Sequence, residues 1–221
     1  ISENYSLWLN GSKNYRVPTF NDLFWREGGN KNLKPEKSYQ VEIGHEFRFN
    51  NFKIDLSGYM ISSTDMIKWV PVRGTLWKPE NISKALNKGI ETNLSYHLKF
   101  RKNIFRLEGS YSYTHAEDVE RKKQLIYVPY HQFSSGIYHQ YERVSSFVRM
   151  FYNGPAYTTT DNSQSIPGFQ VFDLGFEYNL NRNPNIILGG TIKNLMNVYY
   201  ENVAYRPMPS RNFQFYLNIN V

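Results

Sequence analysis

A two-residue alternation of apolar and polar side chains runs through most of the chain. In residues 38–49, Tyr39, Val41 and Ile43 fall on one face of an extended backbone and Glu42 falls on the other. No segment sustains the spacing of an amphipathic helix. We therefore predict an all-β protein with ten strands, at residues 3–12, 38–49, 52–62, 89–100, 104–114, 131–140, 144–152, 170–180, 186–195 and 211–221.

Charged side chains keep to one face of these predicted strands. Past Glu3, the apolar face carries no Asp, Glu, Lys or Arg. Strands of soluble domains are usually about five or six residues long. The predicted strands run to about ten, which favours a membrane barrel with an apolar face toward lipid and a polar face toward the lumen. Seven lumenal charges could line a transport path or form a ladder of ion pairs between strands: Glu42, Glu46, Arg48, Lys53, Asp55, Glu91 and Arg106.

The connections between the predicted strands alternate between short and long. Outer-membrane barrels have tight periplasmic turns at one rim and long loops at the cell surface. This pattern predicts a transmembrane antiparallel β-barrel segment in the bacterial outer membrane, with a periplasmic C-terminus. The long connections are at residues 13–37, 69–87, 115–130, 153–169 and 196–210. The last strand would face lipid with Phe213, Phe215, Leu217, Ile219 and Val221.

Composition removes several other classes of protein. The 4 Trp, 18 Tyr and 15 Phe among 221 residues argue against disorder, and no apolar run approaches the roughly 18–20 residues of a membrane helix. The net charge is +7, but Lys and Arg are scattered, so no nucleic-acid partner is predicted. There is no cysteine, and the five histidines lack metal-ligand spacing. We predict no metal site, no cofactor and no enzyme activity, since GxSxG, P-loop and HExxH motifs are absent.

Five segments, in order along the chain, resemble landmarks of TonB-dependent outer-membrane receptors. They are NYRVPTFNDLFW with GNKNLKPEKS (residues 14–25 and 29–38), residues 65–67, residues 87–91, residues 192–197, and the final strand at 211–221. Two positions depart from the family pattern: Ser210 stands where Gly is common, and Val221 where the terminal residue is usually aromatic. The resemblance implies that residues 1–221 are the last ten strands of a 22-stranded barrel, without its plug domain and N-terminal strands.

The resemblance also implies a function. Such receptors actively import large scarce nutrients, here cobalamin or a ferric siderophore, with energy from a TonB complex that acts through the missing N-terminal part. The other partners implied are outer-membrane lipid, the remainder of the receptor and a surface lipoprotein.

Aromatic and arginine side chains in the predicted long loops are the best candidates for ligand contact. Rings offer broad apolar area, and guanidinium groups form charge-assisted hydrogen bonds with anionic groups. The same residues could instead anchor the barrel at the membrane interface or pack the loops. The candidates are Trp69, Arg73, Trp77, Tyr157, Tyr205 and Arg206.

Two other classes of protein fit parts of the pattern. A complete ten-stranded barrel enzyme, such as an outer-membrane surface protease, has the same strand count and would need acidic pairs with a histidine at the rim. Glu117 and Asp118 lie near His115, but no second acidic pair accompanies them. A surface-adhesive or soluble β-protein is the third class.

Overall fold

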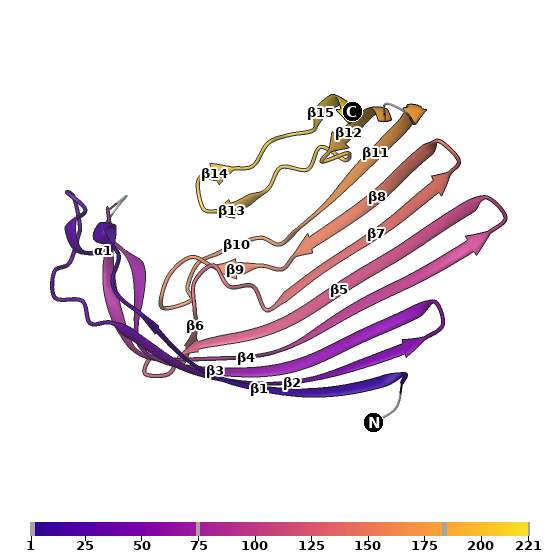
Figure 1. Ribbon diagram of the computed structural model, residues 1–221. Coiled ribbons are helices and arrows are strands. Elements are labelled where there is room, and N and C mark those ends of the chain that lie inside the picture. The colour runs from indigo at the N-terminus through magenta and orange to yellow at the C-terminus, as the bar shows by residue number, and fades with distance from the viewer. Residues whose placement is uncertain (1–2, 74–75, 183–184, 221) are drawn as a thin grey trace.

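Ten long antiparallel strands form one curved sheet in the computed structural model, which describes residues 3–73, 76–182 and 185–220 (Figure 1). Each strand pairs with the next long strand along the chain, as the alternation predicted. Their bounds are β1 Tyr5–Arg16, β2 Glu36–Phe49, β3 Phe52–Arg73, β4 Leu76–Phe100, β5 Asn103–Asp118, β7 His131–Tyr141, β8 Val144–Asn153, β11 Phe169–Arg182, β12 Asn185–Lys193 and β15 Asn212–Asn220.

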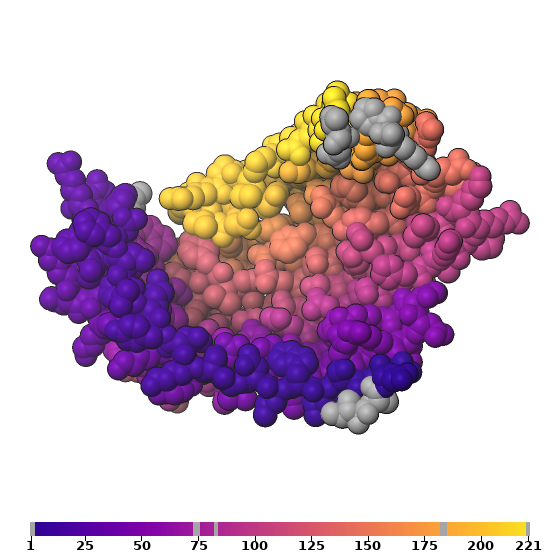
Figure 2. Space-filling view, viewed as in Figure 1, coloured from indigo at the N-terminus to yellow at the C-terminus, as the bar shows by residue number. Residues whose placement is uncertain are grey.

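The sheet is open. Among the described residues, β1 pairs only with β2 and β15 only with β12, so these two strands are the edges. The sheet bends into a trough whose hollow side is visible in Figures 1 and 2. A complete ten-stranded barrel, which the enzyme alternative requires, would need β1 to pair with β15, and the described strands do not do so.

The outward face of the sheet is apolar. Residues at matching positions of successive strands make a continuous row on this face: Leu107, Ile137, Val148, Leu174, Ile192 and Phe213. On the last strand, Phe213, Phe215, Leu217 and Ile219 share this face and are all exposed, Phe215 by 83%. Val221 lies outside the described residues. An apolar band this broad is what a barrel presents to lipid.

The hollow face combines polar side chains with aromatic rings laid over glycines. A Cβ atom at Gly44 would lie 2.1 Å from the indole of Trp8, and one at Gly175 would lie 2.1 Å from the ring of Phe147. Only glycine lets these rings lie against the sheet, so large aromatics occupy the inner wall without filling the trough. The same arrangement pairs Tyr59 with Gly89 and Tyr216 with Gly189.

The connection between β3 and β4 differs from the sequence prediction. A loop was expected at 69–87, but β3 and β4 continue as a paired hairpin that extends beyond the sheet, with Met66 opposite Ile82 and Trp69 opposite Pro79. Proline lacks a backbone donor and is confined to strand edges. Beyond the end of β2, the hairpin has two free edges, which accommodate both Pro71 and Pro79.

The other long connections also contain short elements. These are α1 (Phe20–Phe24), β6 (Lys123–Gln124), β9 (Ala156–Tyr157) with β10 (Ser165–Ile166), and β13 (Glu201–Val203) with β14 (Arg206–Pro207). Within the described residues, no helix has the length and apolarity needed to cross a membrane.

The two faces predict opposite responses to the same substitution. In the barrel that the resemblance implies, Leu174→Arg should lower the free energy of unfolding from lipid vesicles by roughly 2 to 4 kcal/mol, because Leu174 lies in the outward apolar row. Ser110→Arg is the matched control, since Ser110 lines the hollow face beside Asn93 and Ser134. Denaturant titration measures both, and equal losses would show that the faces are wrongly assigned.

The open edges predict that residues 1–221 do not form a stable monomer in a membrane by themselves. Unpaired backbone groups on β1 and β15 would find no water in the hydrocarbon region. Expressed alone, the chain should give no heat-modifiable, protease-resistant species, and co-expression with the N-terminal strands that the resemblance implies should restore one. A folded monomer of the isolated chain would contradict this.

Candidate functional site

Hydrogen bonds join the loop after β1 to the β3–β4 hairpin, at the end of the sheet that carries the long connections, which we call the long-loop rim. The first of these contacts involve the short helix α1. Thr19 caps α1: its hydroxyl accepts a hydrogen bond from the backbone N–H of Asp22 (3.2 Å). In return, the Asp22 carboxylate accepts from the Thr19 backbone N–H at 2.8 Å, which completes a capping box. Asp22 is 5% exposed, so its charge must be met by such donors.

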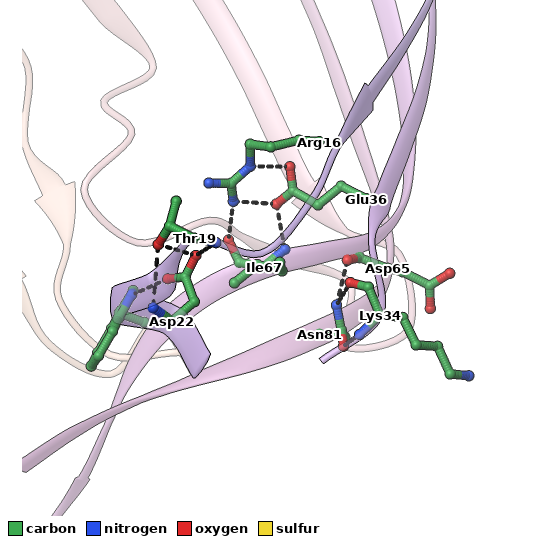
Figure 3. Close-up of polar contacts among 9 residues, drawn as sticks. Arg16, Thr19, Asp22, Lys34, Glu36, Asp65, Ile67 and Asn81 are labelled. Atoms are coloured by element: carbon green, nitrogen blue, oxygen red, sulfur yellow. Dashed lines mark hydrogen bonds and ion pairs between the residues drawn. The ribbon is translucent and has the colours of Figure 1, made fainter. Parts of the chain in front are cut away.

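Asp22 joins the helix to the β3–β4 hairpin. The indole N–H of Trp69 donates to the Asp22 carboxylate at 2.8 Å. Burial by itself would raise the pKa of Asp22, but the hydrogen bonds from Thr19 and Trp69 outweigh it and hold the pKa below its usual value. Figure 3 shows this carboxylate between the helix and the hairpin. Its ionised form therefore fixes the loop after β1 against β3.

Glu36 ties three strands together where they leave the sheet. The Arg16 guanidinium, at the end of β1, donates two hydrogen bonds of 2.6 Å to the Glu36 carboxylate at the start of β2. The same carboxylate accepts from the backbone N–H of Ile67 in β3 at 2.5 Å (Figure 3). A bidentate arginine pair with a third donor is among the stronger arrangements for a carboxylate.

Asn81 fastens the second half of the loop. Its side-chain oxygen accepts from the Lys34 backbone N–H at 2.8 Å, and its amide nitrogen donates to the carbonyls of Lys34 (3.0 Å) and Asp65 (2.6 Å) (Figure 3). Asn30 adds a bond to the carbonyl of Pro79 at 3.2 Å. The loop between β1 and β2 is thus attached to the hairpin through Asp22, Asn30 and Lys34.

The other side of the hairpin contacts the connection after β5. Lys68 donates to the carbonyl of Ile126 at 3.4 Å, and burial lowers the pKa of Lys68 to about 8, opposed by the nearby charge of Asp118. Beside this contact, Ala85 packs with Ala116 and other buried apolar residues. The hairpin is therefore held from both sides at its base.

The six predicted ligand contacts lie in different settings. Trp69 is engaged by Asp22. The ring of Trp77 lies 6.4 Å from that of Tyr127, whose backbone N–H donates to the carbonyl of Tyr157, so the structure brings Trp77 and Tyr157 into one neighbourhood. Tyr205 is 94% exposed, and Arg206 beside it is also exposed. The side chain of Arg73 lies outside the described residues.

Sequence reasoning missed exposed aromatics on and after α1. Phe20 is 77% exposed, and its ring lies 4.7 Å from that of Phe24, with Trp25 also exposed. Lys31 lies over the Phe24 ring at 5.4 Å. The sequence feature that could have predicted this cluster is the pair of aromatic residues at i and i+4 within FNDLFW. That segment was noted only for its family resemblance.

The predicted lumenal charges form ion pairs. Glu46 accepts from Arg48 at 2.6 Å and from Lys53 at 2.8 Å, and Lys53 also contacts Asp55 at 3.1 Å. Arg106 pairs with Glu108 at 3.0 Å. Of these four pairs, Glu46–Lys53 joins two strands, β2 and β3, and the other three lie within one strand, so the ladder between strands stays a prediction. By register, Glu42 and Glu91 share the same face, opposite Tyr59 and Ser57.

The residues that the enzyme alternative would use have structural contacts. The Asp118 carboxylate accepts from the backbone N–H groups of Glu120 and Arg121, each at 3.1 Å, and is buried. The ring of His115 stacks near Tyr130, with centroids 6.0 Å apart. Among the described residues, no three His, Asp or Glu side chains are grouped so that they could hold a metal ion.

Comparison with known proteins identifies the family. A family model described as "TonB dependent receptor-like, beta-barrel" matches residues 1–195. The chain belongs to this family. A curated relative, the vitamin B12 transporter BtuB of Photobacterium profundum, is 27% identical over 204 residues, which are 90% of this chain and 33% of the relative. The chain therefore spans about a third of that relative's length.

Solved structures of TonB-dependent receptor barrels have the same fold. The copper transporter OprC aligns with a TM-score of 0.81 and 21% identity, over 96% of this chain and 36% of that protein. A variant of the ferric enterobactin receptor PfeA from Pseudomonas aeruginosa aligns with a TM-score of 0.76 and 17% identity, over 98% and 38%. The relatives are named as transporters or receptors and not as enzymes. At these identities, the structural matches show the fold alone.

The hydrogen bonds of Asp22 predict that the attachment of residues 17–35 to the hairpin depends on the Asp22 carboxylate and on pH. Asp22→Asn should weaken the attachment of residues 17–35 by roughly 1 to 3 kcal/mol, because the charged acceptor for Thr19 is lost in a buried setting. Hydrogen exchange of the Trp69 indole and protease cleavage within 17–35 should both become faster. Phe24→Leu, which leaves the network intact, is the control; equal exchange in Asp22→Asn and the parent would contradict the assignment.

The sign of the pH effect follows from the lowered pKa of Asp22. A carboxyl group whose pKa is lower when folded stabilises the fold fully above its unfolded pKa, about 3.9, and loses that contribution as the pH falls through the folded value. Protection of the Trp69 indole should therefore persist at pH 5 and decline only below about pH 4.

Proposed function

We propose that this chain provides the last ten strands of a 22-stranded TonB-dependent receptor in the bacterial outer membrane. The plug domain and the other strands would be contributed by parts of the receptor outside residues 1–221. Support comes from the two open edges of the sheet and from relatives about three times longer than this chain. The long loops would face the cell surface, and the short turns and the C-terminus would face the periplasm. The outward apolar row would contact lipid.

The proposed activity is TonB-dependent import of cobalamin. The observation that carries this substrate is the likeness to a vitamin B12 transporter over 90% of the chain. A ferric siderophore is the second candidate, because the ferric enterobactin receptor shares the fold. Energy would come from the TonB complex through the part of the receptor outside this chain, and a surface lipoprotein is a further proposed partner.

The rim geometry suggests how a large ligand would be held. The polar contacts of Asp22, Glu36 and Asn81 fix the hairpin and the loop after β1 before any ligand arrives. A fixed scaffold reduces the conformational entropy that binding must overcome. Exposed groups such as Tyr205 and Phe20 then offer ring faces around the mouth of the trough. The proposed contacts are Trp69, Arg73, Trp77, Tyr157, Tyr205 and Arg206.

Uptake measurements test the activity. The full receptor should restore cobalamin-dependent growth and uptake of labelled cobalamin to a bacterium that lacks its own cobalamin receptor, and only when the TonB complex is intact. Haem and ferric siderophores tested in parallel decide the substrate. Uptake of a ferric siderophore without cobalamin would replace the first candidate by the second, and uptake independent of TonB would contradict the mechanism.

The exposed rim residues should contribute to ligand affinity. In the full receptor, Tyr205→Ala combined with Arg206→Ala should weaken binding of the imported nutrient by roughly 1 to 3 kcal/mol, with unchanged barrel yield. Tyr15→Ala is the matched control, because Tyr15 is 62% exposed at the same rim but lies on the outward face. Equilibrium binding in detergent measures all three proteins, and unaltered affinity of the double variant would limit Tyr205 and Arg206 to loop packing.

A further inference from the structure

Among the described strands, the outward face carries charged side chains only along the long-loop rim. The strand register shows which residues point outward. The following holds for the described strands, without the part of β3 and β4 that extends beyond the sheet. The charged residues at outward positions there are Lys13, Lys37, Lys84, Lys88 and Glu117, all at this one rim. The four lysines, which we call the rim lysines, are exposed and belong to β1, β2 and β4. The sequence prediction of an uncharged face stopped short of them because the strands extend further than expected.

Strand pairing places the rim lysines near one another. Lys37 and Lys84 both pair with Thr64 of β3, one from each side, which puts their backbones roughly 10 Å apart. Lys13 pairs with Tyr39, and its ammonium group lies 5.4 Å from the centre of that ring. Such a group of like charges repels itself unless an anion lies among them. The outward carboxylate of these strands, Glu117, pairs with Leu86 and so lies diagonally beside Lys84 and Lys88; four lysines with one carboxylate leave the group positively charged.

A shallow outward groove begins beside Lys88. It measures about 430 Å³, and its outward lining includes Val41, Ile43, Gly58, Met60, Lys88 and Ile90. Gly58 creates the hollow: a Cβ atom there would meet only the carbonyl oxygen of Gly89, at 3.9 Å. Close packing therefore does not require glycine at this position. The groove is apolar along its length and has an ammonium group at its upper end.

We propose that the rim lysines and this groove bind a phosphate-bearing lipid of the surrounding leaflet. Ammonium groups form charge-assisted hydrogen bonds with phosphate oxygens, and the groove has the character of a site for an acyl chain. Tyr15 and Tyr39, between the lysines, are residues that favour the membrane interface. The proposal rests on the proposed orientation, which puts this rim in the outer leaflet.

A lipid titration tests the proposal on the full receptor. The probe is lipid A that carries both of its phosphates, added to the purified receptor in detergent and detected by native mass spectrometry. Lys13→Gln, Lys37→Gln, Lys84→Gln and Lys88→Gln together should weaken its binding roughly tenfold or more, since each basic residue near an anionic headgroup contributes. A control removes four lysines of the connections at the same rim, namely Lys31, Lys34, Lys122 and Lys123, and should bind like the parent.

Two further comparisons separate charge from shape. Arginine at all four rim positions keeps the charge and should retain lipid A, while lipid A without phosphates should bind the parent and the glutamine variant equally. Equal affinity of the parent and the glutamine variant for phosphorylated lipid A would overturn the proposal, as would an equal loss in the loop control. Heat-modifiability confirms assembly; if the quadruple variant fails to assemble, the pairs Lys13→Gln/Lys37→Gln and Lys84→Gln/Lys88→Gln carry the same test. No nutrient is present, so this result and the import result are independent.

Discussion

The need to pair backbone N–H and C=O groups in hydrocarbon governs the whole architecture. A strand in lipid has no water to bond, so each of these ten strands must have a hydrogen-bonded neighbour on both sides. The eight inner strands satisfy this within the chain, and β1 and β15 do so on one side only. The described sheet therefore has two edges whose backbone groups lack a strand partner, and the proposed function assigns their partners to the rest of the receptor.

The sequence pattern predicts the strands, because their pairing imposes a regular alternation. It does not predict the structure at the rim. A period of two is set by backbone geometry, so the faces of Val41 and Glu42 follow from alternation once the segment is extended. The β3–β4 extension was predicted to be a loop, and its two prolines, Pro71 and Pro79, are residues that normally interrupt sheets. A strand tolerates proline where no neighbouring strand needs a backbone donor from that position. Whether such a neighbour is present cannot be read from the local sequence.

The polar network at the rim was also beyond the reach of pattern reasoning. Arg16 and Glu36 are 20 residues apart, and Asp22 and Trp69 are 47 apart. Nothing local in the sequence shows that these groups meet, because their contact depends on the register of three strands. Both segments of the loop belong to the stretch that carries the family resemblance, and the structure shows that they hold the buried Asp22 carboxylate and the bidentate Arg16–Glu36 pair.

The two faces of the sheet have different side-chain requirements, and the same two-residue alternation meets both. Outward positions of the described strands carry no charge below the long-loop rim, where the rim lysines lie. Inward positions must be polar and yet leave space, and glycines beneath Trp8 and Phe147 let large rings lie against the wall. Because a ring laid on the sheet projects less into the trough than a standing one, aromatic content and an open interior are compatible. The connections at the rim can vary without disturbing the pairing of the wall, because side chains such as Tyr205 project from them into solvent.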